Sequence, residues 1–549
     1  MSIHPLAGQP APKDVLIDVD ALRAAYHDIA PDPDNPAQKV AFGTSGHRGS
    51  ALAGSFNEAH IVAVARAVLD YRESRGFTGP LYIGIDSHAL SEPAMRTAVE
   101  VFVAGGAEVR VSAGGALTPT PLVSRAIISY NHGRASGFAD GVVVTPSHNP
   151  PGDGGFKYNP PHGGPADSAV TGWIEDRANA YLAKANRGAV RTPYQSARSA
   201  ANFAEHDFIL PYVLDLSKVL NLAPVRSSGL AIGVDPLGGS SLPVWDAVAE
   251  VHGLNLTVVN RTIDPTFGFM RLDHDGQIRM DCSSPYAMAG LVALKDDFDL
   301  AVACDPDADR HGIVARSAGL MNPNHYLCAA VDYLLTNRPD WPAAAAVGKT
   351  VVTTALIDRL AAQFGRAVLE VPVGFKWFVE PLSGARAVFG GEESAGASFL
   401  EKKGAAWTTD KDGVLLALLA AEMTAVSGED PARRYEAIAS RLGRPVYERR
   451  DAPASREQKK ALARLSPGDI ASDSLAGEKV LAVLSRAPGN DQAIGGIKVV
   501  AESGWFAARP SGTEDVYKIY AESFSGREHL DRLLAEAKAV VDKALSAAG

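Results

Sequence analysis

The sequence contains little cysteine. Its 549 residues include three cysteines, Cys282, Cys304 and Cys328, and none of them is part of a CxxC pair. Such sparse thiols disfavour a zinc site and a disulfide framework, and they fit a reducing compartment.

Long apolar runs are also absent. No run approaches the roughly 18 residues needed to span a bilayer. Residues 1–13 carry Pro, Gly and Gln where a signal peptide has an apolar core. We therefore expect a cytoplasmic protein with no membrane partner.

A surplus of positive charge is missing as well. Lys and Arg total 53 against 63 Asp and Glu, which gives a formal net charge of -10. Nucleic-acid binders usually present a basic face, so we expect no nucleic-acid partner. At about 150 residues per domain, the length predicts three to four domains.

Three short apolar runs open directly into polar loops, as buried strands of an α/β sheet do. These runs are 141–144, 299–304 and 387–389, and the loops are 145–150, 305–309 and 390–394. Helical spacing of apolar residues occurs at 59–71, 326–335 and 413–423. This alternation predicts repeated α/β domains with functional groups at strand ends.

The last hundred or so residues have a different pattern. Strand-like runs at 504–508 and 516–521 flank a turn-rich loop, and a helix-like run covers 527–545. We interpret this part as a smaller α+β domain. The predicted domains are 1–210, 211–322, 323–443 and 444–549.

The acidic loop 305–309 is a candidate metal site. Asp305, Asp307 and Asp309 alternate directly after an apolar run, and carboxylates this close repel one another unless a cation lies among them. Oxygen-only ligands favour Mg²⁺, Mn²⁺ or Ca²⁺ over zinc. An EF-hand is excluded because its Gly and Glu are missing at the sixth and twelfth positions. A solvated acidic turn is the alternative.

Ser147 is a candidate nucleophile or phosphate carrier. It lies between Pro146 and Pro150 at the end of an apolar run, and prolines stiffen a loop. No GxSxG elbow surrounds it, so a Ser-His-Asp hydrolase is disfavoured. Adjacent residues seldom form the required hydrogen bond, so the neighbouring His148 is weak evidence of a pair. An ordinary turn serine is the alternative.

Two further loops offer ligands for a phosphosugar. Glu392, Glu393 and Ser394 can accept and donate hydrogen bonds to sugar hydroxyls. A phosphate cradle without a P-loop motif is expected at Arg509, Ser511, Gly512 and Thr513. A strand-end turn and a hairpin turn are the respective alternatives.

Two basic residues complete the set of candidates. Arg48 lies in the glycine-rich segment 43–49, and Lys157 follows Ser147 in segment 154–158. Either cation could stabilise a transferring phosphoryl group, although each alone could be a surface charge. Together these candidates predict phosphoryl transfer on a sugar: a serine, a site for a hard metal ion, ligands for sugar hydroxyls and a phosphate-binding loop.

The sequence resembles the α-D-phosphohexomutases from about Gly43 to Lys518. The resemblance rests on segments GTSGHRG (43–49), TPSHNP (145–150), DPDADR (305–310), GEES (391–394) and RPSGT (509–513). The run FKYNPPHGGP (156–165) is similar to the glucose-specific bacterial phosphoglucomutases.

The resemblance implies a fold of four domains around a central cleft: three similar α/β domains with mixed sheets and a C-terminal α+β domain like the TATA-binding protein. It implies a Mg²⁺ site made of a phosphoserine oxygen and three carboxylates: Ser147, Asp305, Asp307 and Asp309. It places proton transfer and charge stabilisation at Arg48, His148, Lys157 and Lys411. It places substrate binding at Gly374, Lys376, Glu392, Ser394, Arg509, Ser511, Gly512 and Thr513.

The implied reaction is the conversion of glucose 1-phosphate to glucose 6-phosphate through phosphoserine and glucose 1,6-bisphosphate, in a monomer or homodimer. Mannose or glucosamine phosphates are alternative substrates, because no identified loop clearly reads C2. The functions of a metal-dependent phosphatase and of a phosphosugar-binding scaffold also stay open. Some relatives have a histidine where this sequence has Gly396, so the general base stays open among Lys157, His148, Arg48 and Lys411.

Overall fold

The computed structural model describes residues 3–43, 46–470, 472–512 and 516–546. The chain divides into two compact units. One unit contains Ile3–Met321 and Ala395–Asp430, and the other contains Asn322–Ser394 and Pro431–Gly549. Within the described ranges, no helix has the length and apolarity that crossing a membrane requires.

The first unit begins with a six-stranded mixed sheet in the order β1-β5-β4-β2-β3-β6. Its strands are β1 (His47–Ser50), β2 (Leu81–Ile85), β3 (Val109–Ser112), β4 (Asp140–Val144), β5 (Asp153–Asn159) and β6 (Phe203–His206). Strands β2, β3, β4 and β6 pair in parallel, whereas β5 is antiparallel to both β4 and β1. The helices around it are α1 (Val19–Asp28), α2 (Glu58–Arg75), α3 (Ser91–Ala104), α4 (Thr120–Asn131), α5 (Ser168–Leu182) and α6 (Tyr194–Ala197).

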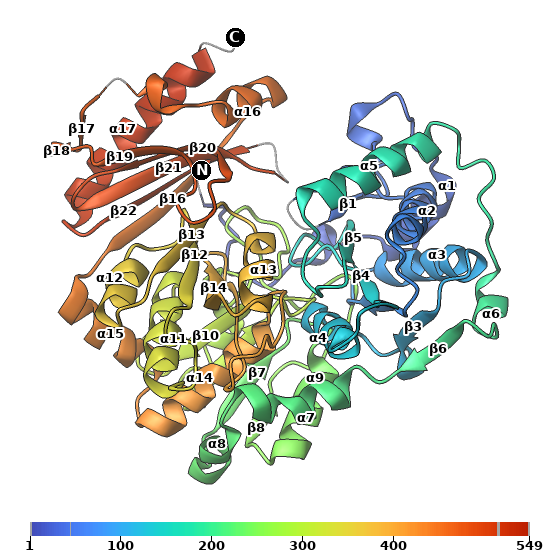
Figure 1. Ribbon diagram of the computed structural model, residues 1–549, viewed down its shortest axis with the longest axis horizontal. Helices are drawn as coiled ribbons and strands as arrows, with labels where there is room; N and C mark the ends of the chain where they lie inside the picture. Colours follow the sequence, from blue (N-terminus) through green and yellow to red (C-terminus); the bar gives the residue numbers. More distant parts are fainter. Residues whose placement is uncertain (1–2, 44–45, 471, 513–515, 547–549) are drawn as a thin grey trace. The chain divides into compact units, whose positions relative to one another are not determined.

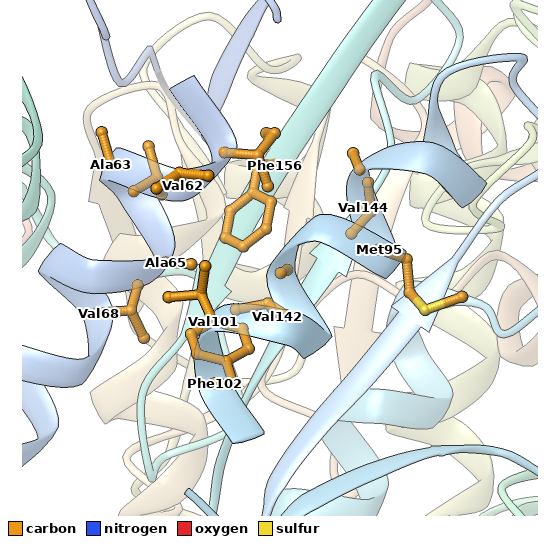
Figure 2. Close-up of a cluster of buried hydrophobic side chains, with 14 of the residues drawn as sticks. Val62, Ala63, Ala65, Val68, Met95, Val101, Phe102, Val142, Val144 and Phe156 are labelled. Atoms are coloured by element: carbon orange, nitrogen blue, oxygen red, sulfur yellow. The ribbon is translucent and has the colours of Figure 1, made fainter. Parts of the chain in front are cut away.

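The core of this sheet lies beneath α2 and α3. Figure 2 shows Val68 of α2 and Phe102 of α3 beside Val142 of β4, with Phe156 of β5 in the same cluster. All four side chains are fully buried. Because β4 and β5 are buried by this packing, the loop between them has two fixed ends.

A second mixed sheet in the same unit has the order β11-β10-β9-β7-β8. Its strands are β7 (Ile232–Asp235), β8 (Leu256–Val258), β9 (Leu300–Cys304), β10 (His311–Ala315) and β11 (Gly319–Leu320). The accompanying helices are α7 (Ile209–Val219), α8 (Leu222–Ser228), α9 (Leu242–His252) and α10 (Ala289–Val292). The later strand β15 (Gly396–Phe399) and helix α14 (Gly413–Ser427) belong to this unit, and α14 packs on β9 and β10.

The other unit contains a parallel arrangement of β13 (Val368–Val371), β12 (Ala346–Thr350) and β14 (Ala387–Glu392). Its helices are α11 (Pro323–Asn337), α12 (Leu356–Gln363), α13 (Val379–Ser383) and α15 (Pro431–Leu442). Helix α11 packs against α12 and α15.

The C-terminal sheet of this unit is antiparallel, with the order β16-β22-β21-β20-β19. Its strands are β16 (Val446–Pro453), β19 (Ala482–Arg486), β20 (Ala493–Val500), β21 (Gly504–Pro510) and β22 (Val516–Ser523). A small hairpin joins β17 (Ser474–Leu475) and β18 (Glu478–Lys479). Helices α16 (Arg456–Ala463) and α17 (Arg527–Ser546) cover one face of the sheet (Figure 1).

The strands and helices expected from the sequence are confirmed within a few residues at each end, including the α+β character of the last part. Four candidate residues expected in loops lie in strands instead: Arg48, Lys157, Glu392 and Arg509. The reason is strand pairing. Three of them pair with a residue of a neighbouring strand: Arg48 with Gly155, Lys157 with Val143, and Arg509 with Lys518. Glu392 is the last residue of β14.

The C-terminal sheet uses both faces. Phe506 and Ile519 pack in the core beneath the helices, whereas Trp505 and Tyr520 pack with Val351 from the end of β12. This alternation follows the two-residue period of a strand. The apolar contact joins the two sheets of this unit.

A buried ionic cluster also lies between these two sheets. Glu370 of β13 contacts two ammonium groups, that of Lys349 at 3.2 Å and that of Lys498 at 3.0 Å. The lysine side chains are 1% and 4% exposed. Lys349 also contacts Asp358 at 2.5 Å. Glu370 therefore neutralises cations from both sheets of the unit.

We expect Glu370→Gln to lower the free energy of unfolding by about 3–5 kcal/mol, because it leaves buried ammonium groups without their partner. Chemical denaturation measures this loss. Glu380→Gln is the matched control, since Glu380 pairs with Arg386 while 70% and 64% of these two side chains are exposed. That control should change stability by no more than about 1 kcal/mol. Equal effects of the two substitutions would contradict the role given to the buried cluster.

Candidate active site

Two hairpin loops bring the candidate serine and carboxylates together. One joins the antiparallel strands β4 and β5 and carries Ser147, and the other joins β9 and β10 and carries Asp305. The Ser147 hydroxyl donates to Asp305 Oδ2 at 2.8 Å. Both residues belong to the first unit and are buried. The structure therefore brings the serine and the acidic loop together.

Ser147 has an uncommon backbone conformation. Its φ angle is +63°, in the left-handed region that non-glycine residues rarely adopt. Its N–H donates to Thr145 Oγ1 at 2.8 Å, and the Thr145 N–H donates to the Gly155 carbonyl at 2.9 Å. A Cβ atom at Gly155 would lie 2.1 Å from the Thr145 carbonyl oxygen. Glycine at 155 thus lets the loop lie directly against β5.

The three aspartates form the cluster that the sequence predicts. Oxygen atoms of Asp305, Asp307 and Asp309 lie within 4.8 Å of one another, and all three residues are buried. Asp307 Oδ1 and Asp309 Oδ1 have no hydrogen-bond partner within the described part of the chain. Burial, followed by the charges of Asp307 and Asp309, raises the pKa of Asp305 well above its usual range. Hard, partly unsatisfied oxygens held this close fit a divalent cation such as Mg²⁺.

Cationic side chains surround this acidic cluster. The Lys157 ammonium contacts Asp307 Oδ2 at 2.6 Å and Asp309 Oδ2 at 3.0 Å, and the Lys411 ammonium contacts Asp309 Oδ2 at 2.9 Å. Burial opposes the charge of Lys157, but Asp307 and Asp309 outweigh it and raise its pKa. Lys157 comes from β5 through its pairing with Val143 of β4.

Arg48 reaches the serine loop from the other side of β5. It lies in β1 opposite Gly155 of β5, and its guanidinium donates to Asn149 Oδ1 at 3.3 Å. Burial and the charge of Arg310 lower its pKa. Arg48 and Lys157 are thus brought to one loop by the pairing of β1, β5 and β4.

His148 lies beside the serine. Its Nδ1 is 3.3 Å from Ser147 Oγ, so here adjacent residues do come within contact, contrary to the expectation from their spacing. Burial, followed by the charge of Arg310, lowers the pKa of His148 well below its usual range. A neutral imidazole has one nitrogen that accepts a hydrogen bond.

Two charged residues near His148 are absent from the candidates that the sequence suggested. The guanidinium of Arg310 lies 3.8 Å from Asp309. Asp281 acts electrostatically on both His148 and Arg310. Arg310 directly follows the aspartates in the sequence, so this adjacency could have identified it as a candidate site residue. No local pattern marks Asp281.

Gly396 leaves room for Lys411. A Cβ atom at this position would lie 2.1 Å from Cδ of Lys411. The side chain of Lys411 therefore occupies the space that a side chain at position 396 would take. A side chain at 396 would have to displace Lys411 from Asp309.

A second group of candidate residues lies in the other unit. Glu392 is the last residue of β14, and its Oε1 accepts from the Gly374 N–H at 2.9 Å. Gly374 precedes the short 3-10 helix Phe375–Phe378, which contains Lys376. The structure thus brings together the Gly374–Lys376 segment and Glu392. Ser394 is half-buried shortly after the strand ends.

The candidate phosphate cradle begins at the end of β21. Arg509 lies in the strand opposite Lys518 of β22, and its Nε is buried with no hydrogen-bond partner among the described residues. Ser511 is buried and its N–H donates to the Val516 carbonyl at 2.8 Å, while Gly512 is exposed. Thr513 lies outside the described residues. A buried guanidinium N–H with unused donor capacity is suited to an anion.

Comparison with known proteins places this chain in a family. Residues 39–184, 211–319 and 322–442 match the α/β/α domains I, II and III of phosphoglucomutase/phosphomannomutase. Residues 469–540 match the C-terminal domain of the same family. The chain therefore belongs to the phosphoglucomutase/phosphomannomutase family.

Individual relatives agree with this assignment. A phosphoglucomutase from Komagataeibacter xylinus is 57% identical over 98% of this chain and 97% of that protein. A phosphoglucosamine mutase from Thermus thermophilus is 25% identical over 90% of this chain and 96% of that protein. The solved open form of parafusin, a phosphoglucomutase from Paramecium, has a similar fold, with a TM-score of 0.71, 19% identity and coverage of 92% and 95% of the two chains.

We expect Mg²⁺ to raise the melting temperature of the protein after chelator treatment, because a cation relieves the repulsion among the buried carboxylates. At one hundred times its Kd, a ligand specific for the folded state contributes about 2.7 kcal/mol. Asp307→Asn should remove most of this shift in a thermal melt. Asp296→Asn, at an aspartate whose side chain is 74% exposed, should keep it. A shift that persists in Asp307→Asn would contradict the assigned site.

Proposed function

We propose that this protein interconverts glucose 1-phosphate and glucose 6-phosphate, with Ser147 as the phosphoryl carrier. The observation that carries the proposal is the contact of 2.8 Å between the Ser147 hydroxyl and Asp305, within a buried cluster of three carboxylates. The 57% identity to a phosphoglucomutase over nearly the whole chain supports glucose as the sugar.

The reaction proceeds in two transfers. Phosphorylated Ser147 first gives its phosphoryl group to O6 of glucose 1-phosphate: the bond from phosphorus to O6 forms, the bond to Oγ breaks, and the O6 proton passes to Oγ. The glucose 1,6-bisphosphate then turns over in the site. Its O1 phosphoryl group returns to Oγ while O1 takes a proton, which leaves glucose 6-phosphate.

His148 is the candidate that can hold the travelling proton. The cations of lysine and arginine have no acceptor, so Lys157, Lys411 and Arg48 can only donate. An imidazole, unlike these cations, has a nitrogen that can accept a proton, and Nδ1 of His148 lies 3.3 Å from Ser147 Oγ. Of the four candidates for the general base, His148 therefore has the chemistry that the role requires.

Asp305, Asp307 and Asp309 would hold Mg²⁺ together with an oxygen of phosphorylated Ser147. A bound Mg²⁺ supplies positive charge next to the phosphoryl oxygens on which negative charge accumulates. Lys157 and Arg48 supply further positive charge from neighbouring strands. These groups are fixed before the reaction, so little reorganisation is needed during transfer.

A further set of residues has substrate-binding roles in this proposal, as the resemblance implies. Glu392 and Ser394 hold sugar hydroxyls, and the Gly374–Lys376 segment beside Glu392 distinguishes the orientation of the sugar. Arg509, Ser511, Gly512 and Thr513 hold the phosphate that is not reacting. Because O3 and O4 roughly exchange places when the sugar turns over, one carboxylate-hydroxyl pair can serve both orientations.

We expect Ser147→Ala to lose mutase turnover by at least about 10³-fold, because the covalent carrier is removed. A coupled assay for glucose 6-phosphate, with Mg²⁺ and a trace of glucose 1,6-bisphosphate, measures this loss. Circular dichroism should report an unchanged fold. Full activity of Ser147→Ala would refute the assigned carrier.

We expect Arg509→Ala to raise KM about 10- to 100-fold with a smaller change in kcat, because it removes charge-assisted hydrogen bonds to the non-reacting phosphate. Steady-state kinetics with glucose 1-phosphate separates the two constants. Arg486→Ala is the control, since Arg486 lies in the same sheet with 56% of its side chain exposed. A similar rise in KM in both variants would count against a phosphate contact at Arg509.

Three measurements decide the preferred sugar and distinguish the mutase from a phosphatase or a scaffold. Values of kcat/KM for glucose, mannose and glucosamine phosphates decide the preferred hexose. Released inorganic phosphate would identify a phosphatase, and binding without turnover after phosphorylation of Ser147 would identify a scaffold.

A further inference from the structure

A buried pair of side chains lies beneath the Ser147 loop and forms no part of the site described above. Asp86 and His88 follow β2, which pairs in parallel with β4, so both strands deliver their next residues to the same sheet edge. Asp86 is 2% exposed and His88 is 3% exposed. They are separated from the serine loop by more than fifty residues of sequence.

Asp86 holds the beginning of the serine loop. Its Oδ2 accepts from the Thr145 hydroxyl at 2.6 Å, and the same Thr145 oxygen accepts from the Ser147 N–H at 2.8 Å. The carboxylate therefore fixes the rotamer of Thr145, which in turn fixes the amide of Ser147. The other carboxylate oxygen, Oδ1, accepts from the Ser91 hydroxyl at 2.5 Å and from the backbone N–H of His88 at 3.0 Å.

His88 holds the end of the same loop. Its Nδ1 lies 2.8 Å from Asp86 Oδ2, and its Nε2 lies 3.1 Å from the carbonyl oxygen of Asn149. A carboxylate and a carbonyl are both acceptors, so both ring nitrogens donate and the imidazole is positively charged. Burial opposes this charge, but Asp86 outweighs it and raises the pKa of His88. The ring also contacts Phe267, with centroids 4.9 Å apart.

The pair therefore grips the loop on both sides of its strained residue. A non-glycine residue at positive φ costs on the order of 1–3 kcal/mol and persists only where its surroundings hold it. Ser147 is such a residue. The hydrogen bonds at Thr145 and Asn149 leave its backbone little freedom to relax.

The charge of the pair matters as well. The imidazolium of His88 neutralises Asp86, so the pair adds no net negative charge near the acidic cluster of Asp305. Ser147 alternates between a hydroxyl and a phosphate that carries about -1.5 to -2 charge. Because the Asp86–His88 pair has no net charge, it can hold the loop backbone both when Ser147 is a free hydroxyl and when it is phosphorylated.

We propose that Asp86 and His88 are positioning residues that hold the Ser147 loop in the geometry needed for phosphoryl transfer. The inference rests on the proposed function of Ser147. Neither residue contacts the reacting oxygen, so both act through Thr145 and Asn149.

The test compares variants that remove the hydrogen bonds of Asp86 and His88 to the Ser147 loop with variants that keep them. We call this set of hydrogen bonds the brace. His88→Phe keeps a ring beside Phe267 and removes both side-chain hydrogen bonds. Thr145→Val keeps the shape of the side chain and removes its hydroxyl, whereas Thr145→Ser keeps the hydroxyl. His60→Phe is the matched control, because His60 is fully buried in α2 and its ring nitrogens contact the Asn57 N–H and the Gln38 carbonyl, away from the serine loop.

We expect His88→Phe and Thr145→Val to lower kcat about 10- to 100-fold, because a displaced nucleophile of even 1 Å can cost this much. KM should change less than kcat, and Thr145→Ser should remain close to the wild type. The double variant His88→Phe/Thr145→Val should lose less than the product of the two single losses, since both residues act on one loop.

Hydrogen exchange of the peptide that contains Ser147 supplies a readout independent of substrate. His88→Phe and Thr145→Val should lose protection there, whereas His60→Phe should not. If the wild type turns over no hexose phosphate, the proposed function fails, and hydrogen exchange still decides whether the brace exists. If His88→Phe does not fold, the contrast between Thr145→Val and Thr145→Ser decides. Wild-type kcat and wild-type exchange in Thr145→Val would overturn the inference.

Discussion

Burial of three carboxylates in one hairpin loop is the constraint on which the site depends. An uncompensated buried carboxylate is costly, and Asp305, Asp307 and Asp309 lie within 4.8 Å of one another. The neighbouring elements must therefore supply positive charge. Lys157 and Lys411 do so from β5 and from the segment before α14.

This requirement links the two hairpins of the first unit. Lys157 reaches Asp307 and Asp309 from a strand whose partner, β4, ends just before Ser147. The ion pair that compensates the carboxylates therefore also fixes where the serine lies. The contact between Ser147 and Asp305 at 2.8 Å follows from the same arrangement. The pairing of β4 with β5 thus places both the lysine that compensates the carboxylates and the serine that contacts them.

The sequence alone predicted the parts of the site that are local. The alternation of Asp305, Asp307 and Asp309 and the prolines around Ser147 are visible as short patterns, and the structure places both segments at strand ends. What the patterns did not reveal is that each loop closes an antiparallel hairpin. The returning strand β5 carries polar residues such as Lys157, so it lacks the apolar signature that marks β4. Residues that act through long-range pairing could not be predicted either. Asp86 and His88 meet the Ser147 loop only because β2 lies beside β4, and strand order and register, which decide such contacts, do not follow from apolar periodicity.

The buried ionic cluster around Glu370 and the cluster of Asp305, Asp307 and Asp309 differ in how completely their carboxylate oxygens are paired. Between the two sheets of the other unit, each carboxylate oxygen of Glu370 contacts a lysine ammonium, so cations of the protein itself pair with both oxygens. In the acidic loop, Asp307 Oδ1 and Asp309 Oδ1 remain without a hydrogen-bond partner among the described residues, although Lys157 and Lys411 lie nearby. A cluster kept only for stability gains from satisfying every oxygen, because unpaired buried polar atoms are costly. Incomplete satisfaction of the acidic loop is therefore the physical feature that suits it to receive a metal ion and a phosphoryl group.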